Sequence, residues 1–208
     1  MRWEILDSAR TAVLPRLAIA GERGFFLAGG TAVALRYGHR VSEDFDFFRA
    51  APFLPGDLFR DLGGNIPGMT LVQADKNTLT AHCGPVKLSF FGGISDAFLP
   101  FSPTAWFPVA DMPDVACMKL WAMMNREAEK DYADMAVILR QYPLADVLVR
   151  FRERHGDAVS PAALLKALTY FGDIRPGEVT YLEPGLDFEK VKTSLSSAVS
   201  SYIRPSRP

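Results

Sequence analysis

The sequence predicts a mixed α/β fold that is followed by a helical region. Short apolar and aromatic runs typical of strands occur between residues 25 and 91 and alternate with helical spacing. From residue 111 onward the pattern contains only helix starts and stops. A chain of 208 residues is long enough for one domain with a smaller appendage. We therefore expect an α/β domain over residues 1–110 and a helical region over residues 111–208 packed on it, with a disordered tail after about residue 203.

The first half contains a glycine turn between a short strand and a short helix. Residues 25–28 form an apolar run bounded by glycines, which indicates a buried strand. Gly29 and Gly30 supply the turn, and the helix predicted from Thr31 ends before Gly38. Helical spacing also predicts helices over 4–20 and around 56–62, and strand patterns cover 45–48, 69–73, 78–83 and 86–91.

The second half begins with a strong helix start at Asp111-Met112-Pro113-Asp114. It predicts one long helix through about Arg140, which Pro143 stops. Further helices are expected over 144–156, 160–172 and 187–202. The aromatic-rich stretch before this half, residues 90–110, is either a connection wrapped around the core or an aromatic surface for a base or a partner protein.

Composition favours a soluble cytoplasmic protein. The net charge is −1, so no global basic field indicates a nucleic-acid binder, although a local basic face would suffice. Two cysteines, Cys83 and Cys117, without a motif fit a reducing cytosol better than a disulfide scaffold. The N-terminus has no signal-peptide pattern, and prolines and glycines interrupt residues 88–110, so no membrane partner is expected.

Two carboxylates on one predicted strand indicate a metal site. Asp44 and Asp46 are two residues apart and therefore share a face of a strand. Like charges on one face repel unless a cation lies between them, and Mg²⁺ (or Mn²⁺) prefers one or two carboxylates together with phosphate oxygens. The alternative is an exposed strand end that happens to carry acids. Phe45, Phe47 and Phe48 argue against it, because they indicate a mostly buried strand.

The glycine turn supplies a matching phosphate site. Gly29, Gly30 and Thr31 present backbone N–H groups and a hydroxyl at the positive end of a helix. Triphosphate at this turn and metal at the acid pair are the parts needed for nucleotidyl or phosphoryl transfer. Arg40 and Ser42 precede the acids and are either triphosphate contacts or ordinary turn residues.

Basic residues recur on the helix predicted downstream. On one continuous helix, Lys119, Arg126 and Lys130 fall within about 40° of one another. Such a face is either solvated or binds phosphate, and Asp134 one turn beyond Lys130 would relieve part of the repulsion. Arg126 and Lys130 have the further alternative of pairing with acids of the fold.

These motifs together resemble a known family. Leu27-Ala28-Gly29-Gly30-Thr31-Ala32, followed by His39-Arg40-x-Ser42-x-Asp44-x-Asp46, is similar to the AbiEii/AbiGii-type nucleotidyltransferase toxins of the polymerase-beta-like superfamily. A second block, from Asp114 through Lys119, Arg126, Lys130 and Asp131 to Asp134, agrees with that family's downstream helix. The resemblance spans about residues 20–140.

The resemblance implies a nucleotidyltransferase-like mixed sheet flanked by helices. It also implies transfer of NMP from an NTP to a hydroxyl acceptor, with tRNA or another RNA as acceptor and a cognate antitoxin as partner in abortive infection. Lys119 and Asp131 would belong near the active site as catalytic residues alongside Asp44 and Asp46. Lys119 would neutralise charge on the departing pyrophosphate.

One position departs from the superfamily's pattern. Those enzymes carry a third carboxylate on a later strand, and the equivalent position here is Ser89. A serine holds no charge at neutral pH and is a poor base and Mg²⁺ ligand. Either the acceptor is activated otherwise, as by Asp131, or the chain is a catalytically impaired nucleotide-binding or interaction module. A small-molecule, antibiotic-type nucleotidyltransferase is a third hypothesis.

Overall fold

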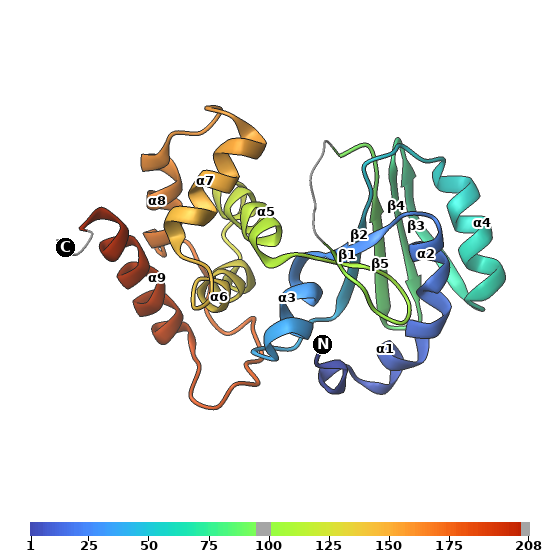
Figure 1. Ribbon diagram of the computed structural model, residues 1–208. Coiled ribbons are helices and arrows are strands. Elements are labelled where there is room, and N and C mark those ends of the chain that lie inside the picture. Colours follow the sequence, from blue (N-terminus) through green and yellow to red (C-terminus); the bar gives the residue numbers. More distant parts are fainter. Residues whose placement is uncertain (95–100, 205–208) are drawn as a thin grey trace. The chain divides into compact units, whose positions relative to one another are not determined.

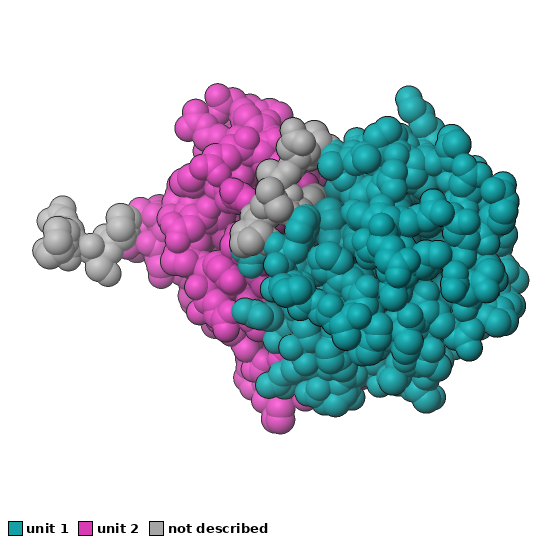
Figure 2. All heavy atoms as spheres, turned by 45° about the vertical axis from the view of Figure 1, so that its right-hand side comes forward, with its two compact units in different colours: residues 1–36, 42–111 teal, residues 37–41, 112–208 magenta. Residues whose placement is uncertain are grey.

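The computed structural model describes residues 1–94 and 101–204, which form two compact units. Unit 1 comprises residues 1–36 and 42–111, and unit 2 comprises residues 37–41 and 112–208 (Figure 2). The short segment 37–41 thus belongs to unit 2, although both of its neighbours along the chain belong to unit 1. Most of the tail predicted after about residue 203 lies outside the described residues.

A mixed sheet forms the centre of unit 1 (Figure 1). Its order is β3-β4-β5-β2-β1-β7-β6, so β2 lies inside the sheet between β1 and β5. β2 runs antiparallel to β1 and parallel to β5. This confirms the predicted mixed α/β class. The strands are β1 (Phe26–Ala28), β2 (Asp44–Phe48), β3 (Met69–Asp75), β4 (Thr78–Cys83), β5 (Val86–Phe91), β6 (Phe101–Ser102) and β7 (Val109–Ala110).

The register of β2 places two buried phenylalanines on one face of the sheet and both acids on the other. Residues directly opposite each other on neighbouring strands lie on the same face. Phe45 pairs with Leu88 and Phe47 with Phe90, and all four side chains are fully buried. The rings of Phe47 and Phe90 stack with centroids 5.1 Å apart. The intervening positions of β2, Asp44 and Asp46, therefore lie on the other face, where they are half-buried.

The first predicted helix of unit 1 is interrupted, whereas the next two extend slightly beyond their predicted ranges, over residues 29–37 and 55–65. The helix expected over residues 4–20 is divided into four pieces, because Pro15 has no N–H to continue an α-helical ladder and Asp7 caps a new start. The segments are the 3₁₀ turns Trp3–Ile5 and Leu14–Leu17 and the helices α1 (Ser8–Val13), α2 (Ala18–Glu22), α3 (Gly29–Tyr37) and α4 (Pro55–Asn65).

The described part of the aromatic-rich stretch, residues 90–94 and 101–110, wraps around the core. The ring of Phe107 is almost fully buried and lies 5.0 Å from that of Phe47, edge to face. The Thr104 hydroxyl accepts hydrogen bonds from the backbone N–H groups of Trp106 and Phe107, which shapes the turn before β7. Phe98, also in this stretch, lies outside the described residues. The two-residue strands β6 and β7 have no counterpart in the prediction.

Unit 2 is helical, as the sequence predicts. The prediction of one long helix through about Arg140 is wrong, because two helices occupy that range. The chain leaves the helical conformation at residues 126–128, and Ala128 is extended with φ −118° and ψ 116°. The Asn125 side chain donates to the Trp121 carbonyl, which closes the first helix. Lys119, Arg126 and Lys130 consequently do not share one helical face. The helices are α5 (Met112–Asn125), α6 (Glu129–Ile138), α7 (Leu144–His155), α8 (Pro161–Thr169) and α9 (Phe188–Ile203).

A membrane-spanning helix is absent from the described residues, because none of their helices is long and apolar enough.

Adding a methyl group at two glycines of unit 1 should change the free energy of unfolding in opposite directions. A Cβ at Gly21 would lie 2.8 Å from the Trp106 carbonyl oxygen, so the backbone must shift. We expect Gly21→Ala to lower the free energy of unfolding by about 1–3 kcal/mol. At Gly63, inside α4, a Cβ meets open space, so Gly63→Ala should raise it by about 0.5–1 kcal/mol. Urea unfolding followed by circular dichroism measures both, and a stabilising Gly21→Ala would contradict the packing described here.

Candidate functional site

The predicted acid pair lies against the glycine turn in unit 1. Ala28, the last residue of β1, pairs with Asp46, so the turn that follows β1 is adjacent to the acids. Gly29 has φ +67°, and a Cβ there would lie 3.1 Å from the Asp46 carboxylate oxygen Oδ2. A side chain at Gly29 would therefore be strained and would crowd the carboxylate. The glycine permits the close approach of Asp46 to the N-terminus of α3, whose dipole favours negative charge.

A chain of hydroxyl groups joins the start of α3 to the start of β2. The Thr31 hydroxyl donates its single proton to the Asp44 carbonyl oxygen, which can only accept. Ser42 Oγ lies 2.8 Å from Thr31 Oγ1 and must then be the donor of that hydrogen bond. Thr31 is almost fully buried, so its hydroxyl fixes the position of Asp44. The triphosphate contacts predicted for Thr31 and Ser42 stay predictions.

The neighbouring strand β5 supplies no third carboxylate. Ser89 pairs with Asp46 in the parallel register of β2 and β5, and Lys87 pairs with Asp44. The remaining residues of β5 are apolar, so no shift of the alignment along this strand would bring an acid beside the pair. Within residues 1–94 and 101–204, no group of three or more His, Cys, Asp or Glu side chains is placed to hold a metal ion. Ser89 therefore stands where the resemblance implies a carboxylate.

The donor set nevertheless fits a hard divalent cation that arrives with phosphate. Asp44 and Asp46 lie on the same half-exposed face of β2. Mg²⁺ is commonly held by one or two carboxylates, with phosphate and water oxygens completing the shell. Two carboxylates beside a helix N-terminus meet that requirement without a third protein ligand.

The second group of predicted site residues lies in unit 2, in a buried cluster of charges. Asp134 accepts from Arg40 Nε at 2.7 Å and from Arg40 Nη2 at 2.8 Å, and His39 Nε2 lies 2.9 Å from the same carboxylate. All three side chains are almost completely buried. Burial opposes the charged form, but Arg40 and Lys119 together hold the pKa of Asp134 far below its usual range. The Arg40 guanidinium is thus committed to Asp134 and to the Val41 carbonyl.

Lys119, Arg126 and Asp131 complete this cluster. Lys119 Nζ lies 2.8 Å from Asp131 and 2.5 Å from Asp134, and Arg126 Nε donates to Asp131 at 2.7 Å. Burial alone would lower the pKa of Lys119, but the two aspartates raise it above its ordinary value. The pKa of Asp131 is lowered, because Lys119 and Arg126 outweigh its burial. Arg126 is half-exposed, and Lys130 is an exposed residue of α6.

The backbone of segment 39–41 is held in unit 2 as well. The Val41 N–H donates to the Thr180 carbonyl, and the Leu182 N–H donates to the His39 carbonyl, both at 2.9 Å. The Tyr181 hydroxyl between them donates to Glu129 at 2.8 Å. Sequence patterns did not predict this arrangement. The signal for it is three acids, Glu129, Asp131 and Asp134, at the start of a segment that is apolar from Met135 to Ile138.

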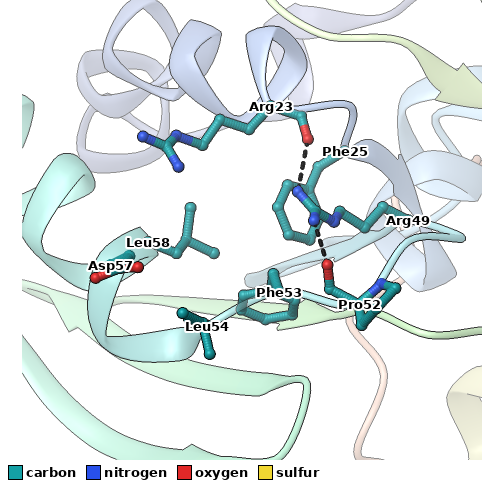
Figure 3. Close-up of a pocket in the computed structure, with 8 residues that line it drawn as sticks. All are labelled: Arg23, Phe25, Arg49, Pro52, Phe53, Leu54, Asp57 and Leu58. Atoms are coloured by element: carbon teal, nitrogen blue, oxygen red, sulfur yellow. Dashed lines mark hydrogen bonds between the residues drawn. The ribbon is translucent and has the colours of Figure 1, made fainter.

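A pocket in unit 1 is separate from the acid pair. It has a volume of about 280 Å³ and lies beyond the Phe26–Phe48 pair, at the opposite end of β1 and β2 from Asp46. Figure 3 shows the residues that line it. The Arg49 guanidinium lies over the Phe25 ring, 5.0 Å from its centroid, and donates to the carbonyls of Arg23, Ala51 and Pro52. These bonds make Arg49 a fixed part of the pocket wall. The lining residues are Arg23, Phe25, Arg49, Pro52, Phe53, Leu54, Asp57 and Leu58.

Comparisons with known proteins show which proteins this chain is similar to. The family model of the nucleotidyl transferase AbiEii toxin of type IV toxin–antitoxin systems matches residues 14–70, which include the glycine turn and both acids. An uncharacterized protein of Aquifex aeolicus (strain VF5), aq_aa25, is 31% identical over 192 residues, covering 86% of this chain and 88% of that protein.

Two solved structures share the fold. The nucleotidyltransferase toxin MenT4 of Mycobacterium tuberculosis H37Rv superimposes with a TM-score of 0.66 at 13% identity, over 93% of this chain and 82% of that one. JHP933 of Helicobacter pylori gives 0.57 at 19% identity, over 92% and 88%.

The mixed sheet, with Asp-x-Asp beside a Gly-Gly turn, is that of a nucleotidyltransferase. The chain belongs to one family with aq_aa25, and within it residues 14–70 match the model of the AbiEii nucleotidyltransferase toxins.

The buried cluster predicts a large cost for removing Asp134. Asp134→Asn leaves Arg40 and Lys119 buried without their shared carboxylate, so we expect a loss of about 3–5 kcal/mol in the free energy of unfolding. The control Glu183→Gln removes an exposed partner of Arg140 in the same unit and should cost less than about 1 kcal/mol. Similar urea midpoints for the two variants would contradict the role assigned to the cluster.

The same carboxylates predict a dependence of stability on pH. The pKa values of Asp131 and Asp134 are lowered in the folded state, so their contribution is complete above the unfolded value of about 3.9. It is lost progressively as the pH falls below that value toward the folded pKa values. In thermal melts between pH 3 and pH 6, the melting temperature of the natural chain should fall more steeply with decreasing pH than that of Asp134→Asn. Parallel declines would contradict the proposed contribution of Asp134.

Proposed function

We propose that this chain is a Mg²⁺-dependent enzyme that transfers NMP from an NTP to a hydroxyl of RNA, with tRNA as the acceptor, and acts as a toxin. The observation that carries the proposal is the position of Asp46 against Gly29, where a Cβ would lie 3.1 Å from the carboxylate, so that the acid pair adjoins the N-terminus of α3. A cation site and a phosphate site adjoin each other there.

The roles of the residues in unit 1 follow from their positions. The backbone N–H groups of Gly29 and Gly30 and the dipole of α3 would bind triphosphate oxygens. Asp44 and Asp46 would hold Mg²⁺ or Mn²⁺, which when bound supplies neutralisation of phosphate charge. The hydroxyl oxygen of the acceptor attacks the α-phosphorus, the bond from that phosphorus to the bridging oxygen breaks, and pyrophosphate leaves. Ser89 cannot take the hydroxyl proton at neutral pH.

The proposed roles in unit 2 belong to the basic residues and Asp131. Arg126 and Lys130 are accessible enough to bind nucleotide phosphates or the acceptor. Lys119, predicted to meet pyrophosphate, and Asp131, predicted to receive the acceptor proton, form a buried ion pair with each other. Substituting Lys119 or Asp131 distinguishes a catalytic role from a structural one. Activity lost at an unchanged melting temperature indicates catalysis, whereas a lowered melting temperature indicates a scaffold.

The acceptor and the biological role rest on family membership. The matching family model describes toxins of toxin–antitoxin systems, and MenT4 is a nucleotidyltransferase toxin. RNA as substrate and an antitoxin protein as partner are therefore the proposed counterparts, in the cytoplasm. The net charge of −1 adds no support for a nucleic-acid partner, so a local surface must bind it.

The assay for this proposal follows label from nucleotide to acceptor. The protein is incubated with Mg²⁺, total RNA and each of the four α-labelled NTPs in turn, and labelled RNA is resolved on gels. We expect label in tRNA, reduced at least about 10³-fold by Asp44→Ala or Asp46→Ala, because the charge of the transferring phosphate is then uncompensated. Asp75→Asn, on the exposed end of β3, is the matched control and should keep full activity.

Other outcomes identify the alternative functions. Label on an aminoglycoside instead of RNA would make the chain a small-molecule transferase. Nucleotide binding without any transfer would make it a binding module that has lost catalysis.

A further inference from the structure

Lys87 is a cation beside the acid pair that the proposed reaction does not yet use. It lies on β5 in direct register with Asp44, on the same face of the sheet. Its Nζ is 3.9 Å from Asp44 Oδ2, and the two side chains are 42% and 38% exposed. The strand that would otherwise offer a third carboxylate thus offers an ammonium group to one of the two acids.

This arrangement changes the charge that an incoming metal ion meets. Two carboxylates without a neighbouring cation would present a charge of −2, whereas Asp44, Asp46 and Lys87 together present −1. A divalent cation and the Lys87 ammonium compete for Asp44, because both are attracted to the same oxygen atoms. Bare metal should therefore bind weakly, and binding should strengthen when a triphosphate brings additional negative charge and oxygen ligands.

Lys87 is also able to leave Asp44 readily. Ion pairs between partly exposed side chains are weak, and a lysine is a point charge on a flexible four-carbon stem. The ammonium has three donors and suits phosphate oxygens as well as carboxylate oxygens. Its position on the strand next to the acids keeps it within reach of whatever anion those acids bind through a metal.

We propose that Lys87 is an exchangeable counter-ion of this site, an inference that rests on the proposed function. Without a divalent cation it pairs with Asp44. When the cation occupies Asp44, Lys87 turns to the phosphate oxygens of the nucleotide. It thereby couples metal binding to nucleotide binding.

The first test measures the affinity of the full chain for Mn²⁺ alone by titration calorimetry. Lys87→Met removes the competing charge while keeping a side chain of similar length, so we expect Mn²⁺ to bind about two- to fivefold more tightly. Lys76→Met is the matched control, since Lys76 is the other lysine of unit 1 and lies in the exposed turn between β3 and β4. It should leave the Mn²⁺ affinity unchanged, and Asp44→Ala should abolish binding.

The second test adds inorganic tripolyphosphate at saturating Mn²⁺, so that no choice of base is needed. Lys87→Met should bind tripolyphosphate about tenfold more weakly, because a charge-assisted hydrogen bond is lost. Lys87→Arg keeps the charge and should stay within about twofold of the natural chain. Circular dichroism melts of every variant verify that the fold is retained.

The outcomes separate this inference from the proposed function. Equal Mn²⁺ affinities in the natural chain and Lys87→Met, both lost in Asp44→Ala, overturn the role of Lys87 and leave the metal site standing. Tighter Mn²⁺ binding with undiminished tripolyphosphate binding overturns the exchange onto phosphate. If Asp44→Ala binds Mn²⁺ like the natural chain, the metal site is absent and both proposals fall.

Discussion

The alternation of aspartate and phenylalanine from Asp44 to Phe47 of β2 is the constraint on which unit 1 depends. Because side chains on a strand point alternately to its two faces, one register places Phe45 and Phe47 in the core and both acids on the opposite face. A slip of one residue would bury two carboxylates and expose two aromatic rings. The hydrophobic energy of the core therefore fixes the geometry of the acid pair, and the site needs no separate scaffold of its own.

The connection between α3 and β2 is fixed twice, once in each unit. In unit 1, the hydroxyl groups of Thr31 and Ser42 join the helix to the start of the strand. In unit 2, Asp134 and the backbone around Tyr181 hold residues 39–41. In the proposed site this connection would join a phosphate-binding turn to two metal ligands, and an error of 1 Å in such sites lowers activity greatly. Lys119, Asp131 and Asp134 of the second sequence block thus belong to the buried cluster that holds Arg40.

The sequence predicted those parts of the structure that follow from local pattern. The glycine turn and the strand of Asp44 to Phe48 were accessible, because strand periodicity and turn chemistry are local. The position of Ser89 beside Asp46 is a long-range pairing, and only the resemblance to the superfamily indicated it. The break at residues 126–128 could not be predicted, since Arg126 and Glu127 are good helix formers. The structure supplies a reason for it, because the break allows Asp131 to form ion pairs with both Lys119 and Arg126. Charge spacing on a helix likewise cannot distinguish a solvated face from a buried ion cluster. Lys119 belongs to the second case.

The absence of an acid from β5 bears on how this site would differ from one with three carboxylates. With Lys87 and Ser89 in the register positions of β5, the protein contributes less negative charge and fewer metal ligands. The nucleotide must then supply more of the negative charge and more of the metal ligands, so that cation and triphosphate are bound together. A site of this kind gives little binding to metal alone and avoids three mutually repelling carboxylates in the free protein. Its cost is that no group of β5 accepts the acceptor proton, which must pass to solvent or to a residue outside that strand.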